Sequence, residues 1–501
     1  MMGSEIAAGA AAVLAGDVLA FLIAGTLLGA VFGALPGLTA TMGVAILTPL
    51  TFWVSTEKGL AMLIGIYCGA IPAGGIPAVL INIPGTPASL AATWDGYPLA
   101  RRGRPGLALG VNALFAWLGQ FVSILFLALA AFPIASFGLR FGPAEYFALA
   151  LFGISLMAGV SAGRLLKGLL AGFLGLALAT VGLDPMTAYP RFTFSSAELL
   201  DGLAFVPVMI GLFGLGEVLA RMMEGSPGSA AAPPALSRIW PGWAQLRRMA
   251  VPGLVGSGIG TLVGAIPAAG GDIASVIAWE QARRTSRRPE EFGHGSLEGL
   301  AASASAANAA IGGAMTTMLT LGIPGDAPSA VLIGALLIHG VQPGPLLFRD
   351  HRALVYSIIF LMLLAALLIL ALGLAGARPL ARTLRIPEPW LWAGVIVLGI
   401  VGSYALNNSL ADVWVMFGAG LLGLLCRRAD VPVGPLVLGL ILGPMMESNL
   451  RRALILSRGD WSALLRRPLV VLLLAAAAVS LAWPLWKAWR SRSYSDPSAR
   501  A

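Results

Sequence analysis

Charged residues are scarce in this chain of 501 residues, and their scarcity excludes a soluble globular domain. Asp, Glu, Lys and Arg make up 11% of the sequence, whereas a soluble domain carries about a quarter, because its surface must be hydrated. Hydrophobic residues make up 58%, and the mean hydropathy is +0.86. Most of the outer surface must therefore face hydrocarbon.

Cysteine and histidine are also rare, which excludes several kinds of chemistry. Cys68 and Cys426 lie in or beside apolar segments and cannot build a disulfide framework, and the three histidines form no Cys/His cluster with metal-ligand spacing. The chain has no Gly-Lys-Ser/Thr phosphate-binding loop. The Gly-Ser-Gly-Ile-Gly of residues 256–260 lacks the strand that a dinucleotide fold needs. We therefore expect no enzymatic activity and no cofactor.

The sequence contains several long apolar runs. A helix needs about 20 apolar residues to cross a bilayer, and runs that approach or exceed this length cover residues 18–32, 107–132, 356–374 and 470–486. The runs are continuously apolar rather than alternating, which indicates helices. We predict an all-α polytopic membrane protein with about 12 transmembrane helices.

The formal net charge of +9 comes from basic residues scattered over short loops between the apolar runs. Short Lys/Arg-rich loops are typical of positive-inside topology, so we expect no nucleic-acid partner. Within the apolar runs Lys and Arg are almost absent. The sequence therefore predicts no cluster of cationic side chains for binding an anion inside the membrane.

Two halves of similar length repeat the same motifs. Residues 25–36 and 256–267 share three glycines and a proline without a gap, and each half later carries a glycine pair followed by Ile-Pro-Gly. The glycine pairs are Gly74 and Gly75 in the first half and Gly312 and Gly313 in the second. The predicted division is an N-terminal membrane repeat (1–223), a Pro/Ala/Ser/Gly-rich linker (224–245), a C-terminal membrane repeat with terminal helices (246–486) and a polar tail (487–501).

The repeated motifs break helices. The glycine ladder favours close helix packing, but proline beside glycine removes a backbone donor and permits a non-helical excursion. Such backbone is tolerated at membrane depth only inside protein or along a wet cavity. Paired breaks in matching parts of two halves point to a transporter binding site, with a kinked packing helix as the alternative.

Residues beside the breaks are the candidate binding residues, because free amides at helix N-termini attract anions. For Asp272 and Asp326 a capping role is equally open, and Asp95 is expected in a turn. The expected ligands of a carboxylate substrate are Asn82, Pro84, Gly85, Thr86, Ser89, Asn308, Pro324, Gly325 and Ser329. The expected ligands of a coupling cation such as sodium are Gly37, Thr39, Gly271, Asp272 and Asp326.

At these motifs the chain resembles the large permease subunit of tripartite tricarboxylate transporters, the TctA family. The resemblance runs from the first apolar run to the C-terminal spans and is carried by residues 33–40, 80–89, 95–103, 292–299, 320–325 and 338–345. It implies an ion-gradient-driven importer of a carboxylate in the bacterial inner membrane. It also implies two partners, a small four-helix membrane subunit and a periplasmic solute-binding protein, and a fold with two inverted repeats.

Other functions remain open from the residues alone. A channel would need a continuous polar pore, and a membrane-embedded enzyme would need clustered Asp, His and Arg at one interface. A non-transporting membrane scaffold is the third alternative. We predict the large subunit of a secondary active transporter that works by alternating access.

Overall fold

The computed structural model describes residues 2–160, 165–224, 239–267, 269–384 and 386–494. Residues 225–238 of the predicted linker and residues 495–501 of the predicted tail lie outside this part of the chain. The described elements up to residue 224 are α1 (Met2–Leu14), α2 (Gly16–Ala34), α3 (Ala40–Thr51), α4 (Thr56–Ala73), α5 (Gly75–Ile81), η1 (Pro87–Ser89), α6 (Leu90–Arg101), α7 (Pro105–Gly138), α8 (Pro143–Val160), α9 (Leu165–Ala179), β1 (Gly182–Leu183), β2 (Pro190–Arg191), η2 (Ala197–Leu199), α10 (Phe205–Met209), η3 (Ile210–Leu215) and α11 (Gly216–Glu224).

The second half is also helical. Its first helix begins inside the predicted linker, and its last continues into the predicted tail. The elements are α12 (Trp243–Gly264), α13 (Gly270–Thr285), η4 (Pro289–Glu291), α14 (Leu297–Leu321), α15 (Ala327–Ile338), α16 (Leu347–Asp350), α17 (Arg352–Ala375), α18 (Ala377–Thr383), α19 (Glu388–Asn407), α20 (Leu410–Arg428), α21 (Val433–Leu456), α22 (Ser462–Leu465) and α23 (Pro468–Tyr494).

The helices confirm a polytopic all-α membrane protein. By length and composition, eight helical segments of the described residues can cross a bilayer, so the prediction of about 12 is not confirmed. α12 and α14 are long enough but are not among the eight, and α3 and α15 are shorter because each begins at a break. The eight are Gly16–Ala34, Thr56–Ile81, Pro105–Gly138, Phe205–Met223, Arg352–Ala375, Glu388–Asn407, Leu410–Arg428 and Val433–Leu456.

Burial separates central from peripheral spans. Within an apolar stretch of 18 residues, 94% is buried in the segment that contains α4 and α5, whereas 22% is buried in α19. The main core cluster joins α4 to α14, α15 and α17, with Tyr67 of α4 among its largest fully buried side chains. α4 is therefore an internal helix, and α19 presents most of its surface to lipid.

The glycine ladders pack α2 on α4 and α12 on α14. A methyl group at any ladder glycine would overlap a backbone carbonyl of the facing helix, so these helices touch through their backbones. The same four-residue spacing occurs on both sides of each contact, in both halves of the chain. The facing pairs are Gly25–Met62, Gly29–Ile66 and Gly33–Ala70 in the first half and Gly256–Ala302, Gly260–Ala306 and Gly264–Ala310 in the second.

The ladders also correct the match between the predicted glycine pairs. Gly85 packs against Gly74, whereas Gly325 packs against Ala314. Gly74 therefore corresponds to Ala314 and not to Gly312 or Gly313. The offset of one or two residues arose because the sequence comparison had only glycines to align, while the structure aligns the backbone contacts.

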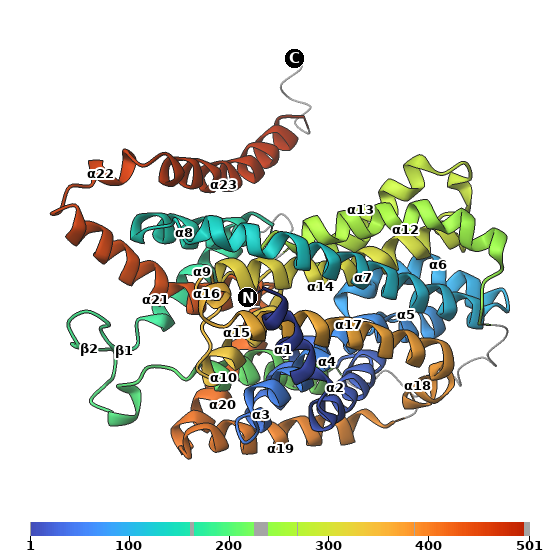
Figure 1. Ribbon diagram of the computed structural model, residues 1–501, viewed down its shortest axis with the longest axis horizontal. Helices are drawn as coiled ribbons and strands as arrows, with labels where there is room; N and C mark the ends of the chain where they lie inside the picture. The colour runs from blue at the N-terminus through green and yellow to red at the C-terminus, as the bar shows by residue number, and fades with distance from the viewer. Residues whose placement is uncertain (1, 161–164, 225–238, 268, 385, 495–501) are drawn as a thin grey trace.

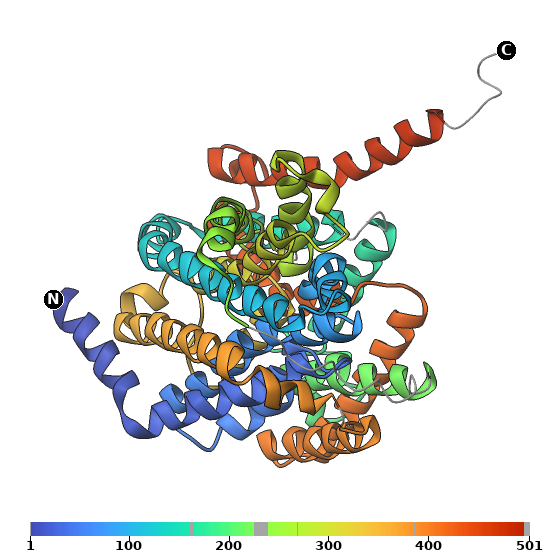
Figure 2. The same ribbon diagram turned by 90° about the vertical axis from the view of Figure 1, so that its right-hand side faces the viewer.

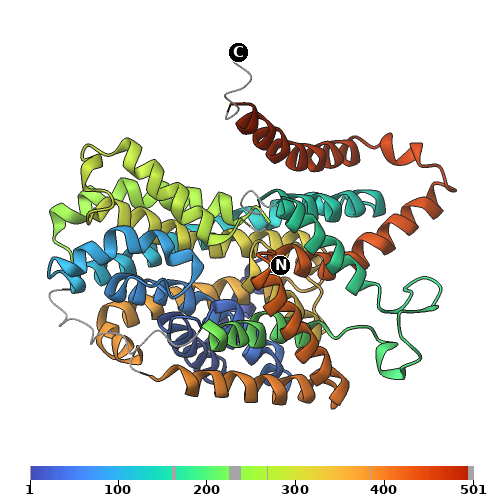
Figure 3. The same cartoon turned by 180° about the vertical axis from the view of Figure 1, so that it is seen from behind.

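Most helices run along the long axis of the molecule (Figures 1 and 3; end view in Figure 2), and both of its ends carry arginines. The hairpin end carries α22 and the β1–β2 hairpin, in which Gly182 pairs with Arg191. The opposite end carries α18 and the turns that follow α6 and α13. We call it the basic end for its arginines Arg101, Arg102, Arg104, Arg247, Arg248, Arg283, Arg284, Arg287, Arg288 and Arg382.

Candidate functional site

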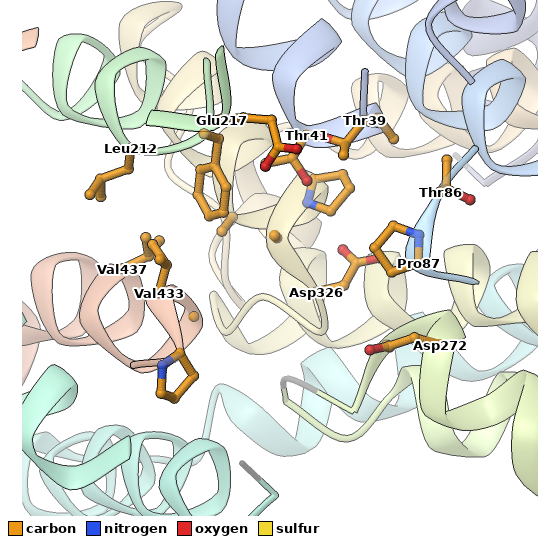
Figure 4. Close-up of a pocket in the computed structure, with 18 of the residues that line it drawn as sticks. Thr39, Thr41, Thr86, Pro87, Leu212, Glu217, Asp272, Asp326, Val433 and Val437 are labelled. Carbon is orange, nitrogen blue, oxygen red and sulfur yellow. The ribbon is translucent and has the colours of Figure 1, made fainter. Parts of the chain in front are cut away.

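A cavity of about 680 Å³ lies where the helix breaks of the two halves meet (Figure 4). The first half contributes the start of α3 and the turn that precedes η1, and the second half contributes the starts of α13 and α15. The η3–α11 segment and the turn between α20 and α21 line the other sides. Predicted residues from separate breaks thus line one cavity, namely Thr39, Thr86, Gly271, Asp272 and Asp326.

The two Pro-Gly breaks have the same backbone geometry. Asn82 ends α5 with φ 60°, and Gly322 ends α14 with φ 72°. The chain then turns back, so that Gly85 lies against the carbonyl of Gly33 and Gly325 lies against that of Gly264. Only glycine leaves room for this approach. Asn82, Gly85 and Gly325 therefore shape the breaks and do not line the cavity, and the same holds for Pro84 and Pro324.

Ser89 and Ser329 close the breaks from within. The Ser89 hydroxyl accepts from the Thr86 amide at 3.3 Å and donates to the Thr86 carbonyl at 2.7 Å. Ser329 forms the same two bonds with Asp326, at 3.0 and 2.9 Å. Both serines are buried and neither lines the cavity. The structure therefore places them as capping residues of the first turn.

Two carboxylates reach the cavity from the second half. Asp326 caps α15 by accepting from the Ser329 amide at 3.0 Å, and its other oxygen accepts from the hydroxyl of Tyr67, which belongs to α4 of the first half. Asp272 lies in the first turn of α13, and no side chain in the described part of the chain donates a hydrogen bond to it. Figure 4 shows both side chains extending toward the same space.

A charged cluster that the sequence did not predict forms the wall facing these carboxylates. Glu217 of α11 bonds Arg221 at 3.1 Å and also pairs with Arg427 of α20. Glu217 and Arg427 line the cavity, together with Asp430. The sequence predicted no cluster of cationic side chains inside the membrane, and it did not predict this one cavity-lining arginine. Arg427 and Arg428 follow an apolar run, and the sequence alone offered topology as their only interpretation.

Gly37 and Asn308 lie behind the cavity wall. Gly37 has φ 91°, and a Cβ built there would stand 3.0 Å from the guanidinium carbon of Arg221, so this turn supports the charged cluster. Asn308 is buried in α14, where its side-chain nitrogen donates to the Ala304 carbonyl at 2.8 Å. Its side-chain oxygen has no hydrogen-bond partner among the described residues. Neither residue lines the cavity.

Asp95 joins the two halves, although it was expected in a turn. It lies in α6, fully buried, and one carboxylate oxygen accepts from the amides of Gly293, Gly295 and Ser296 at 2.8–3.0 Å. The other oxygen accepts from Trp279 Nε1 at 2.7 Å. Burial raises the pKa of the Asp95 carboxyl, and the four donors oppose that rise. Two sequence motifs some 200 residues apart therefore form one contact.

Comparison with known proteins places the chain in a family. A protein from Agrobacterium vitis, described as an uncharacterized 52.8 kDa protein in the TAR-I ttuC' 3'region, is 38% identical over 468 residues, which cover 93% of each chain. A second A. vitis protein, from the TAR-II ttuC' 3'region, is 35% identical over 233 residues, 46% of this chain and 96% of that protein. No solved structure gave a significant match. The model of the tripartite tricarboxylate transporter TctA family matches residues 19–438, and the chain belongs to that family.

Proposed function

We propose that this TctA-family membrane transport protein is the large subunit of a secondary transporter that imports a small carboxylate. Import would use a sodium or proton gradient across the bacterial inner membrane. A periplasmic solute-binding protein would deliver the substrate, and a small four-helix membrane subunit would complete the complex. The observation that carries the proposal is the single cavity lined by helix breaks from both halves.

Arg427 and the helix N-termini supply the attraction for a carboxylate. The amides that begin α3, α13 and α15 face the cavity with the positive ends of their helix dipoles. Arg427 offers a bidentate fork that suits a carboxylate. Glu217 holds Arg427 in this structure but also bonds Arg221. Arg427 can therefore transfer to the substrate without leaving Glu217 unpaired, which would be costly in a partly buried site.

The remaining charges explain why an anion would enter together with a cation. Among the described residues, Glu217, Asp272 and Asp326 line the cavity, against Arg427 as a cationic lining residue. An anionic substrate would add to this excess of negative charge, and a cation near Asp272 and Asp326 would offset it. No group of three or more His, Cys, Asp or Glu side chains in the described residues is arranged to hold a metal. A sodium ion there would need backbone carbonyls of the breaks as further ligands, whereas a proton would need only a carboxylate.

The directions of the helices support inverted repeats and alternating access. From the cavity, α6 runs toward the basic end, whereas α15 runs toward the hairpin end (Figure 1). α6 and α15 follow the matching breaks of the two halves, so matching segments leave the site in opposite directions. Such an arrangement is common in transporters that expose a central site to each side in turn.

Uptake into proteoliposomes tests the proposal. The chain is reconstituted with its small partner, purified binding protein is added outside, and radiolabelled di- and tricarboxylates are supplied with an imposed sodium or proton gradient. We expect uptake that collapses when the gradient is dissipated by an ionophore. Absence of uptake for every carboxylate and both gradients, with correctly folded protein, would overturn the proposal.

A further inference from the structure

A second cavity, of about 630 Å³, lies on the hairpin side of the first. Its lining comes from α9, α10, the C-terminal part of α15 and the later turns of α21. Polar and charged side chains stand along it, among them Asp201, Gln342, Ser448, Asn449 and Arg452. Nothing in the proposed site accounts for these polar and charged side chains in an otherwise apolar lining.

The two cavities occupy successive levels of the same two helices. α15 contributes Ala330 to the first cavity and Ile333 to the second, and α21 contributes Val437 to the first and Ile441 to the second. These positions are three and four residues apart, so the cavities are separated by about one helical turn, or roughly 5 Å. The α15 and α21 helices are in contact with each other.

The partition between the cavities is apolar and tightly packed. Val331 and Leu332 of α15 are 0% and 1% exposed, and Ile333 and Leu440 are also buried. Gly439 of α21 lies against the backbone carbonyl of Gly172 in α9. This apolar layer, about one helical turn thick, closes the way between the two cavities.

The second cavity lies nearer the hairpin end of the molecule than the first. α20 returns toward the basic end, where it brings Arg427 to the first cavity, and α21 then runs from this cavity to the hairpin end. The later part of α21 is tied to the hairpin, because Glu447 pairs with Arg191 at 2.7 Å. The second cavity therefore belongs to the hairpin end.

Arg452 gives the second cavity a cation that is free to bind an anion. Its neighbour Arg451 is engaged by Asp184 at 2.9 Å and by Glu447 at 2.6 Å. Arg452 is exposed, and it forms no ion pair in the described part of the chain. An anion arriving at this cavity therefore meets a guanidinium that forms no ion pair among the described residues, while Asp201 is the carboxylate that also lines the cavity.

We infer that the second cavity is the vestibule of the translocation path at the hairpin end, with Arg452 as the residue that binds the carboxylate there. The partition of α15 and α21 is the closed gate between this vestibule and the substrate cavity. The inference rests on the proposed function for the identity of the anion, but the sidedness of the two cavities does not depend on transport.

Cysteine labelling in oriented membrane vesicles tests the sidedness. Ser448→Cys reports on the second cavity and Val433→Cys on the first, and both native cysteines are buried, so the parent protein serves as the blank. The probe is a sulfonated, membrane-impermeant maleimide. We expect Ser448→Cys to react in one vesicle orientation only and Val433→Cys only in the opposite orientation. Arg288→Cys on the exposed basic loop verifies vesicle orientation.

Other labelling patterns would overturn the inference. Reaction of both cysteines from the same side would mean that the cavities open together, and no reaction of Ser448→Cys from either side would mean that the second cavity is not a vestibule. Gradient-driven uptake by the unmodified complex is measured in parallel. Failed uptake with the expected labelling would overturn the transport proposal, whereas intact uptake with the wrong labelling would overturn the vestibule alone.

The role of Arg452 has its own readout. Arg452→Gln is expected to raise the substrate concentration for half-maximal uptake roughly fivefold, as for loss of one exposed charge pair, and Arg452→Lys to retain most of the affinity. The maximal rate should change little, because the residue lies outside the substrate cavity. An unchanged half-saturating substrate concentration in Arg452→Gln would show that Arg452 does not bind the substrate on its way to the first cavity.

Discussion

The Asp95 contact between the halves should dominate the stability of the membrane domain. In Asp95→Asn, the amide oxygen can still accept from the three backbone amides, but the amide nitrogen then faces the indole N–H of Trp279, and two donors meet. Hydrogen bonds to a charged group contribute about 1.5–3 kcal/mol each, and neutral ones about 1 kcal/mol. Loss of one bond and weakening of three therefore predicts about 3–5 kcal/mol of destabilisation.

Unfolding by titration with dodecyl sulfate measures this free energy, with tryptophan fluorescence as the signal. Glu290→Gln is the matched control, because it removes a nearby carboxylate that forms no hydrogen bond or ion pair among the described residues, and it should change stability by less than about 0.5 kcal/mol. Trp279→Phe should cost about 1.5–3 kcal/mol, and a double-mutant cycle should show coupling with Asp95. If Asp95→Asn is no more destabilising than Glu290→Gln, the Asp95 contact does not stabilise the membrane domain.

Further predictions concern the helix packing, the cavity and the hairpin end. Gly33→Leu places a side chain on the backbone of α4 and should cost about 3 kcal/mol or more of stability in the same titration, whereas Gly258→Ala, which meets open space, should be neutral. Arg427→Gln should raise the half-saturating substrate concentration about tenfold, as for loss of a charged hydrogen bond. Glu217→Gln should lower the half-saturating concentration, because Arg427 loses its competing partner. Proteoliposome uptake measures both variants. A lower value for Arg427→Gln or a higher value for Glu217→Gln would contradict the transfer of Arg427 from Glu217 to the substrate. Backbone amides lower the pKa of Asp184 from 3.8 to about 2, so its stabilisation is present above pH 3.8 and is lost as the pH falls through about 2. Asp184→Asn should flatten this acid dependence of the unfolding midpoint, and an unchanged profile would show that Asp184 does not contribute.

The location of the site followed from the sequence because helix breaking is a local property. Proline and glycine act on their own backbone and on the next turn, so the repeated motifs identified the segments that meet at the cavity. Thr86 and Asp326, which begin the segments after the matching breaks, both line it. Their functional roles remain predictions for the uptake assay.

Other parts of the site depend on contacts across long stretches of chain, which local patterns do not encode. Arg427 reaches Glu217 only because α20 packs beside α11, and its sequence context suggested topology alone. Asp95 sits in a motif that resembles a turn, but its donors come from the other half. Ser89 and Ser329 were correctly associated with the breaks, yet the capping bonds that occupy them become visible only when the backbone is placed.

The glycine ladders have a mechanical consequence. Where α2 meets α4, and α12 meets α14, backbone touches backbone with no side chains between. Side chains are the compressible, rotatable layer at most helix contacts, and these pairs lack it. Each pair therefore behaves as a stiff lever: a push at one end displaces the other end by a similar distance instead of being absorbed along the way. The break that follows each ladder sits at the tip of such a lever, so motion at the cavity need not begin there.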